Sequence, residues 1–340
     1  MTYPKLSDNK KVLAEIEDKD YASAAKQLLI SQLNDWEELA EGYKRLNNVK
    51  VKSFLIDDFH IKLQLNPSRM KSTSAKVGEK EIKKRSCFLC SENLPYDQRG
   101  IKLIDDYVLL CNPYPIFPNH FTIASISHEP QEIKSSFNDF ISLSRMLSDK
   151  YTLIYNGPRC GASAPDHLHF QAGTKQYMPI ENEFHTLIKN HGNEILNNKN
   201  IAINVVDDGL RRFISFESGD VNVLLESFDR FYHLYPNIKS ENEPMMNIIC
   251  NYAKEYGWRA VIFLRHKHRS SHYYLEGNEK ITISPAAIDI GGVCIIPVEK
   301  DFKRIDEETL TEVFEEVSLQ RNDFEKLIML LKEEYNYRSL

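Results

Sequence analysis

Three polar side chains alternate with apolar ones in a short stretch near the middle of the 340-residue chain. His167, His169 and Gln171 take every second position, and Leu168 and Phe170 stand between them. In a β-strand, this period of two places the three polar side chains on one face and turns the apolar ones to a core. Same-face neighbours lie roughly 6.5 Å apart, so the two imidazoles can take separate chemical roles. Two solvated histidines on an edge strand are the alternative.

A Cys-x-x-Cys pair, Cys87 and Cys90, supplies two thiolates from one tight turn. This is half of a tetrahedral zinc site, and two further ligands must come from elsewhere. The candidates are His120, His128 and His167, and we expect His128 and His167 to complete the set. Such a zinc ion is structural, because four protein ligands leave no open position. A redox pair and two buried apolar cysteines are the alternatives, although no thioredoxin-like sequence surrounds the pair.

With His167 on the metal, His169 is the free imidazole. A neutral imidazole, with an unperturbed pKa near ~6.5, can attack phosphorus and later leave, as a double-displacement phosphotransfer requires. Gln171 on the same face can donate a hydrogen bond to a phosphoryl oxygen, and Ser163 and the amides near Gly161 can do likewise. The chain has no Walker A sequence, and Gly161-x-Ser163-x-Pro165 lacks the final glycine of a nucleophile elbow.

Two basic segments lie outside these motifs. Residues 66–85 carry repeated lysines and arginines, and residues 265–269 read Arg-His-Lys-His-Arg. A cationic side chain in either segment can reach a phosphate or a sugar phosphate. A solvated loop or strand end is the alternative for both, and a second metal site is a further one for residues 265–269. The candidate phosphate-binding side chains are Arg69, Lys71, Lys76, Arg265, His266 and His268.

The elements that must position these residues follow from periodicity and turn signals. Helices are predicted over residues 7–48, 134–150, 221–235, 245–256 and 307–335. Strands are predicted over residues 51–56, 59–65, 107–111, 121–126, 167–171, 201–207, 212–217 and 259–264, and residues 281–285 and 286–297 supply further strand material. Because the strands come in hairpins with helices grouped around them, we expect an α+β fold with antiparallel sheet.

Length and composition limit the function classes. A chain of 340 residues favours two lobes, and we expect an N-terminal helical segment (1–50), a catalytic lobe with the zinc site (51–218) and a C-terminal lobe (219–340). The net charge of −6 argues against a nucleic-acid or membrane-surface partner. No apolar run approaches the ~18 residues of a membrane span. Six cysteines that include a Cys-x-x-Cys pair favour a cytoplasmic location. A homodimer is compatible with the sequence.

Several motifs together resemble the histidine-triad superfamily. Asn112-x-x-Pro115, the segment 117–120 and His167-x-His169-x-Gln171 look like its transferase branch, in which glutamine replaces the third histidine. The Cys-x-x-Cys pair with His128, and the segment that starts at Asn156, are similar to galactose-1-phosphate uridylyltransferases, whose zinc site uses these positions. Residues 167–172, 178–181 and 284–292 are similar to GDP-hexose phosphorylases of the GDP-L-galactose type.

This resemblance implies two histidine-triad-like lobes built on antiparallel sheet. It implies His169 as the nucleophile, Gln171 and Ser163 as phosphoryl contacts, Asn156 as an orienting residue, and Asn112 and Gly161 among the substrate contacts. The implied reaction attacks the α-phosphate of a nucleoside diphosphate sugar, forms a nucleotidyl-histidine and passes the nucleotidyl group to phosphate or a sugar phosphate. The alternatives are a hexose-1-phosphate uridylyltransferase, a dinucleoside polyphosphate phosphorylase and a nucleotide-binding protein without catalysis.

Overall fold

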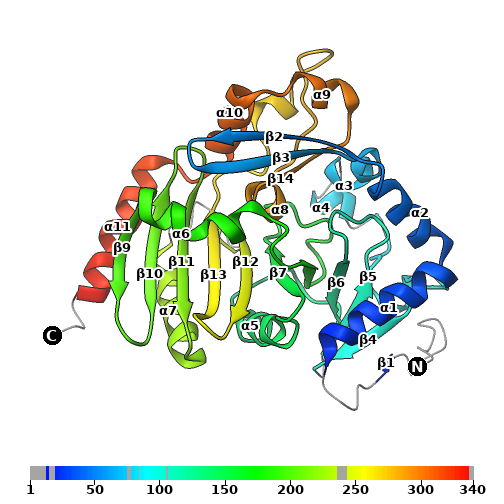
Figure 1. The fold of residues 1–340 in the computed structure, drawn as a ribbon, viewed down its shortest axis with the longest axis horizontal. Helices are drawn as coiled ribbons and strands as arrows, with labels where there is room; N and C mark the ends of the chain where they lie inside the picture. Colours follow the sequence, from blue (N-terminus) through cyan, green and yellow to red (C-terminus); the bar gives the residue numbers. More distant parts are fainter. Residues whose placement is uncertain are drawn as a thin grey trace.

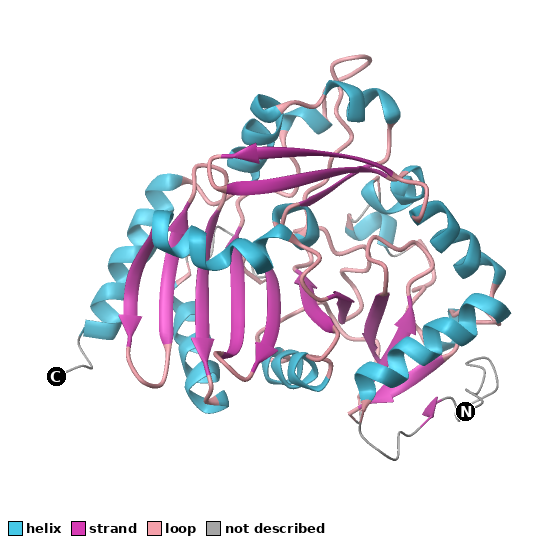
Figure 2. Ribbon diagram, viewed as in Figure 1, coloured by secondary structure: helices cyan, strands magenta, loops and turns pink. Residues whose placement is uncertain are grey.

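A long, mainly antiparallel sheet runs through the molecule (Figures 1 and 2). The computed structural model describes residues 13–14, 20–74, 78–82, 84–104, 106–235 and 243–336. From one edge to the other, the sheet contains β1 (Leu13–Ala14), β4 (Gly100–Leu103), β5 (Tyr107–Cys111), β6 (His120–Ser125), β8 (His169–Thr174), β7 (Tyr151–Asn156), β12 (Met246–Ala253), β13 (Gly257–Leu264), β11 (Arg212–Ser218), β10 (Ala202–Asp207) and β9 (Gly192–Asn197). The predicted α+β class is confirmed.

A three-stranded sheet lies beside the long one, at the top of Figure 1. It consists of β2 (Lys50–Ile56), β3 (Phe59–Leu65) and β14 (Val293–Ile296), with β3 in the middle. The predicted hairpin between β2 and β3 turns at Asp57, whose φ is 49°. Because β14 follows β3 by more than two hundred residues, this sheet joins an early and a late segment of the sequence.

Helices cover both faces of the long sheet, so its central strands are buried on both sides. One core includes side chains of α1 (Tyr21–Asp35), α2 (Glu37–Leu46), α5 (Phe137–Met146), α7 (Val221–Leu234) and α11 (Arg321–Asn336). The opposite core includes side chains of α6 (Pro179–His191), α8 (Ala287–Ile290), α10 (Glu307–Val317) and the small sheet. The shorter helices are α3 (Met70–Thr73), α4 (Glu79–Ile82) and α9 (Glu299–Arg304). In β13, Ala260 and Ile262 join the first core, and Val261 and Phe263 the second.

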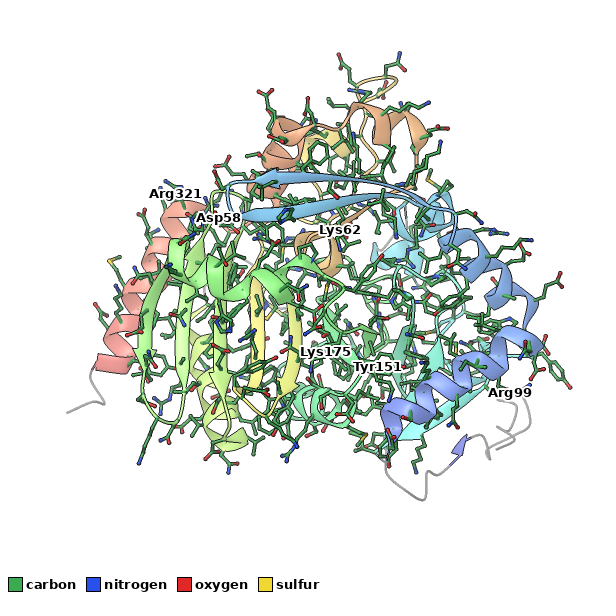
Figure 3. The ribbon with its side chains drawn as sticks, in the orientation of Figure 1. Asp58, Lys62, Arg99, Tyr151, Lys175 and Arg321 are labelled. Carbon is green, nitrogen blue, oxygen red and sulfur yellow. The ribbon has the colours of Figure 1, made fainter. Side chains whose placement is uncertain are left out.

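The two halves of the sequence meet where β7 pairs with β12. This antiparallel pairing places Asn247 opposite Asn156. Lys175, labelled in Figure 3, also links the two halves. Its ammonium donates to the carbonyl oxygen of Ser148 at 2.9 Å and to that of Tyr252, in β12, at 2.8 Å. The sheet is therefore continuous from the first half into the second.

The expected boundary at residue 218 is corrected by the strand order. Residues 192–218 form β9, β10 and β11, and β11 pairs with β13 of the second half. The physical reason is that a hairpin signal, such as Asp208-Gly209, fixes which strands pair locally but not which half of the sheet the hairpin joins. These strands belong with the second half.

Other helix predictions differ in extent or in type. Within the predicted helix 7–48, residues 7–12 and 15–19 lie outside the described part, and Leu13–Ala14 form the short strand β1 instead. The helices α1 and α2 are separated by Trp36, whose backbone is extended. The predicted helix 245–256 is wrong, since this segment forms β12. β12 is paired on both edges and buried on both faces, so its apolar residues show no period of two. No helix in the described ranges has the length and apolarity that a membrane crossing needs.

Candidate active site

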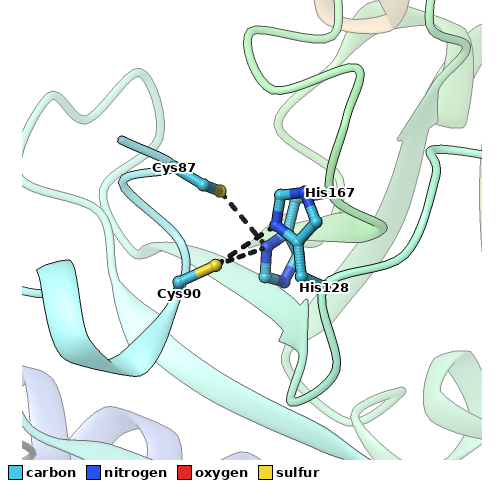
Figure 4. Close-up of side chains that lie close together, drawn as sticks. All are labelled: Cys87, Cys90, His128 and His167. Atoms are coloured by element: carbon cyan, nitrogen blue, oxygen red, sulfur yellow. Dashed lines mark hydrogen bonds between the residues drawn. The ribbon is translucent and has the colours of Figure 1, made fainter. Parts of the chain in front are cut away.

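Two thiols and two imidazoles meet beside the start of β8 (Figure 4). The Sγ atom of Cys87 lies 3.2 Å from Nδ1 of His167, and the Sγ atom of Cys90 lies 3.2 Å from Nδ1 of His128 and 3.6 Å from Nδ1 of His167. All four ligand atoms lie within 4.8 Å of one another. Tetrahedral zinc bonds of 2.0 to 2.3 Å place sulfur and nitrogen ligands roughly 3.5 Å apart. The predicted set of four is therefore brought together with suitable spacing.

The surroundings of the two imidazoles also fit metal binding. Nε2 of His167 donates to the carbonyl oxygen of Ser125 at 2.8 Å, which leaves Nδ1 without a proton and free to bind a metal. Nε2 of His128 lies 3.9 Å from a carboxylate oxygen of Asp166. Burial opposes ionisation of Cys87, but the neighbouring His167 ring and the backbone N–H groups of Leu89 and Cys90 together outweigh it and lower the pKa of this thiol to about 6. His120, the third histidine considered as a ligand, is turned elsewhere.

His169 begins β8 with only 4% of its surface exposed. Its Nδ1–H donates to the carbonyl oxygen of His167 at 2.8 Å, so Nε2 carries the free lone pair. Burial lowers the pKa of His169 to about 4, and the ring is neutral at physiological pH. Gln131 fixes the strand start, because its side chain accepts from the His169 backbone N at 2.7 Å and donates to the carbonyl oxygens of His169 and Asn156, both at 2.9 Å.

A cavity of about 520 Å³ opens in front of His169. Most of its exposed wall is apolar, and it has the size and character of a small-molecule site. Asn112 lies in this wall, with its Oδ1 accepting from the backbone N of Tyr114 at 2.9 Å. The side chains that give the wall its apolar character include Phe88, Leu89, Leu94, Pro95, Leu110 and Tyr114.

A second cavity of about 60 Å³ adjoins the first and is more polar. Arg69, Ser163 and Gln171 line both cavities and mark their junction. The residues that line only the smaller cavity and can contact a ligand through polar atoms include Thr73, Asn156, Gly161, His268, Arg269, Ser284 and Asp289. Burial and the neighbouring Arg269 and Arg265 cations lower the pKa of His268 to about 3, so it is a neutral member of this wall.

Arg69 brings positive charge to the junction. One guanidinium nitrogen donates to the carbonyl oxygen of Tyr114 at 2.9 Å. Burial lowers the pKa of Arg69 to about 10, against a partly compensating attraction to Asp289. The Asp289 carboxylate is itself held by the backbone N–H groups of Ala286 and Ile295, at 2.9 and 2.8 Å, and burial raises its pKa to about 6. The junction is therefore suited to an anionic group such as a phosphate.

Asn156 is fixed by the second half of the chain. Its Oδ1 accepts from Nδ2 of Asn247 and from the backbone N of Ala287, both at 2.8 Å, so its side-chain nitrogen remains for a ligand in the smaller cavity. Arg265 donates to Oδ1 of Asn247. It also donates to the carbonyl oxygen of Pro285 at 3.0 Å. Arg265 thus supports Asn156 and the loop at 284–286.

This placement corrects the prediction that Arg265 binds substrate. Arg265 is 1% exposed and lines neither cavity, because its guanidinium donates hydrogen bonds to oxygen atoms in the protein interior. His266 also lies outside both linings. The side chain of Lys71 in α3, and all of Lys76, lie outside the described residues. Gly161 has φ +101°, and a Cβ there would come 2.7 Å from Cβ of Ala286, so the loop needs glycine at this position.

Two family models match consecutive parts of the chain. Residues 28–174 match a domain of unknown function, DUF4922, and residues 189–337 match the GDPGP1-like, C-terminal domain. The interval between the two matches, 175–188, separates β8 from β9 and agrees with the strand order. No curated protein sequence matches the chain significantly.

The fold is similar to that of yeast Ap4A phosphorylase Apa2. The crystal structure of that enzyme in complex with AMP matches with a TM-score of 0.59 and 14% identity, over 90% of this chain and 98% of that one. A second crystal structure of Apa2 matches with a TM-score of 0.58 and 13% identity, over 87% and 97% of the two chains. The GDPGP1-like match over residues 189–337 and the fold shared with Apa2 support the resemblance to phosphorylases and transferases of the histidine-triad superfamily.

This combination of a domain match and a shared fold agrees with the resemblance found in the motifs. It also confirms the expected histidine-triad architecture on antiparallel sheet. Two residues that support this candidate site were not predicted, because they reach it from distant parts of the sequence. Gln131 and Asn247 are ordinary amides in the sequence, although Gln131 holds the start of β8 and Asn247 holds Asn156. Only their contacts in the folded chain single them out.

Proposed function

We propose that the protein is a nucleotidyltransferase that cleaves a nucleoside diphosphate sugar through a covalent nucleotidyl-His169 and passes the nucleotidyl group to phosphate or a sugar phosphate. The observation that carries this proposal is the unprotonated Nε2 of His169, held in the larger cavity by the hydrogen bond from Nδ1 to the His167 carbonyl. Gln171 and the Arg69 cation stand at the junction beside it.

In the first proposed step, the Nε2 lone pair of His169 forms a bond to the α-phosphorus. The bond from that phosphorus to the bridging oxygen breaks, and its electron pair leaves on the sugar phosphate. The ring becomes cationic, which the hydrogen bond from Nδ1 to the His167 carbonyl stabilises. Gln171, Ser163 and Arg69 would stabilise the charge that develops on the phosphoryl oxygens.

In the second step, an oxygen of the acceptor bonds to the same phosphorus. The phosphorus–nitrogen bond breaks and returns its electron pair to Nε2. With inorganic phosphate as acceptor, the product is a nucleoside diphosphate. Both steps are positioned attacks on one phosphorus, so most of the catalysis comes from orientation and electrostatics.

The two cavities suggest where the parts of the substrate bind. The larger, apolar cavity suits the nucleoside, whose base can lie against Phe88, Leu94 and Tyr114. The smaller cavity would receive the leaving phosphate and then the acceptor, near Asn156 and Arg269. Its volume of about 60 Å³ holds roughly five water molecules, which is comparable to one phosphate group.

A dinucleoside polyphosphate phosphorylase is the second candidate function, favoured by the fold similarity to yeast Ap4A phosphorylase Apa2. The test is to incubate the protein with GDP-, UDP- and ADP-hexoses and with dinucleoside polyphosphates, each with inorganic phosphate or hexose-1-phosphate, and to separate the products. Phosphate-dependent release of a nucleoside diphosphate and a sugar phosphate supports the first candidate. Nucleoside diphosphate formed only from dinucleoside polyphosphates supports the second, and no turnover of any substrate contradicts both.

We also propose that the Cys87–Cys90–His128–His167 cluster holds a structural zinc ion, and that the protein works in the cytoplasm, where its free cysteines stay reduced. Elemental analysis after zinc reconstitution should find one equivalent of zinc in the wild type and in Cys111→Ala, a thiol outside the cluster. Cys90→Ser should lose the zinc and unfold at a lower temperature. Wild-type protein without zinc after reconstitution would contradict the assignment.

A further inference from the structure

Gln171 is useful to a phosphoryl group at only one end of its amide. The nitrogen offers two N–H donors, whereas the oxygen is an acceptor and would repel a phosphoryl oxygen. Which end of the amide faces the cavities follows from its hydrogen-bond partners. The partner of the Gln171 amide is His120, whose Nε2 lies 2.8 Å from Oε1.

The protonation of the His120 ring follows from its other nitrogen. Nδ1 of His120 lies 3.2 Å from the backbone N of Ile116. A backbone N–H can only donate, so Nδ1 must be the acceptor and a neutral ring must carry its proton on Nε2. That proton then points at Gln171, which must present its oxygen to His120 and its nitrogen to the junction of the two cavities.

We propose that His120 is a positioning residue that fixes the amide of Gln171 with its N–H groups toward the reacting phosphoryl group. The relay runs from the Ile116 backbone N–H through the imidazole to the glutamine oxygen. In this relay, the Nε2–H of His120 donates to the Gln171 oxygen. The opposite orientation of the amide is excluded, because the amide N–H groups would then face the Nε2–H of His120.

The rest of the molecule holds this imidazole rigid and neutral. His120 has no exposed surface, and the edge of the Phe117 ring packs on it with centroids 5.2 Å apart. The hydroxyl of Tyr43 in α2 accepts from the backbone N of His120 at 3.0 Å, on the side of the helical N-terminal segment. Burial, and secondarily the Arg69 cation, lower the pKa of His120 to about 3, so the ring has a single proton at physiological pH.

The first test does not depend on catalysis. Nitrogen-15 NMR distinguishes the two tautomers of each histidine, and the His120 signal is assigned by its loss in His120→Phe. We expect the proton on Nε2 at neutral pH. A proton on Nδ1, or a charged ring, would overturn the relay whether or not the protein is an enzyme.

The second test rests on the proposed function and uses the rate at which wild type and variants form the nucleotidyl adduct in single turnover. His120→Phe should slow adduct formation about 10- to 100-fold in the wild-type background but less than about 3-fold in Gln171→Leu, because the relay acts only through the glutamine. His120→Gln, which restores a donor at the position of Nε2, should recover much of the rate. Thermal unfolding checks that each variant is folded.

An equal loss in both backgrounds would mean that His120 is only structural and would overturn the proposal. A loss of nucleoside monophosphate affinity that accounts for the whole effect would also overturn it, since the relay is expected to act on the rate. If the wild type forms no adduct, the proposed function fails, and the tautomer measurement still decides the relay.

Discussion

At the residue scale, the candidate site places a neutral imidazole, His169, and a half-buried cation, Arg69, around one cavity. His169 is kept without charge by burial, whereas Arg69 keeps its charge although burial lowers its pKa. Withdrawing a cation from water costs free energy, which a bound anion offsets. The Asp289 carboxylate attracts Arg69 but is also engaged by two backbone amides, and we propose a bound phosphate as the further partner of Arg69.

Arg69→Ala is expected to reduce kcat/KM about 100-fold or more, because it removes a charge that would stabilise the phosphoryl transition state. Arg69→Lys should recover part of this loss, since lysine keeps the charge but not the planar guanidinium. Phosphate should raise the unfolding temperature of the wild type but not of Arg69→Ala. The control is Arg99→Ala, which removes an arginine that pairs with Asp35 away from both cavities. Equal effects of the Arg69 and Arg99 changes would contradict this role.

At the element scale, α2 supports one wall of the larger cavity. Gly42 of α2 packs so closely that an added Cβ would lie 2.0 Å from the Pro113 carbonyl oxygen. Next to it, the Tyr114 hydroxyl donates to the Glu38 carboxylate at 2.6 Å. The N-terminal segment, which the sequence places outside the chemistry, therefore shapes the cavity that receives the nucleoside in our proposal.

Gly42→Ala should push α2 away from the 113–115 loop. Overpacking of this kind costs roughly 1 to 3 kcal/mol, more than the gain of about 1 kcal/mol in helix propensity. Urea unfolding should show lower stability, and nucleoside monophosphates should bind more weakly. Gly219→Ala is the control, because a Cβ there meets nothing within 4 Å. A variant as stable and as tightly binding as the wild type would contradict the tight packing.

A second link between elements is a buried carboxyl group. Glu243, which precedes β12, accepts from the backbone N of Ile133 and from the Tyr155 hydroxyl. Burial raises the pKa of Glu243 from 4.5 to about 8. Between these values the folded state holds a proton that the unfolded state releases, so stability falls as the pH rises.

Glu243→Gln should remove this pH dependence, since glutamine offers one acceptor and one donor as the protonated acid does. Urea unfolding at several pH values from 6 to 8 should show the wild type losing up to about 1.4 kcal/mol per pH unit relative to the variant. Above pH 8 the two curves should run parallel. Parallel curves already from pH 6 would show that Glu243 is ionised throughout.

At the scale of the whole molecule, both halves of the chain build one site. The larger cavity belongs to the first half, and segments 268–269 and 284–295 of the second half close the smaller one. The continuous sheet across β7 and β12 fixes their separation. Asn156 and Asn247, opposite each other in these strands, couple the two halves directly at the site.

Local patterns predicted what depends on local structure. The alternation over residues 167–171 gave strand β8 with Phe170 in the core and His169 and Gln171 on the cavity, because strand period is a property of neighbouring residues. The Cys-x-x-Cys pair predicted a cluster with His128 and His167, and the four side chains do come together.

Contacts between residues far apart in the chain could not be predicted from the sequence. The segment 245–256 has the apolar content of a buried helix and becomes strand β12, because tertiary pairing on both edges decides its conformation. Arg265 looks like a surface cation but reaches interior oxygens, whereas Arg69, one of three candidates in a polar connector, lines both cavities. The sequence offers His120 as a possible metal ligand. Its actual contact, with Gln171, could not be predicted, because the two residues are 51 positions apart in the sequence.

The central claim is that His169 carries the nucleotidyl group, and intact-mass analysis tests it most directly. The protein is incubated with each nucleoside diphosphate sugar and dinucleoside polyphosphate without acceptor, and the modified residue is located by peptide mapping at alkaline pH. The account predicts an added mass of one nucleoside monophosphate on His169 that disappears when phosphate is added and never forms in His169→Asn. An adduct on another residue, or turnover in His169→Asn at the wild-type rate, would contradict it.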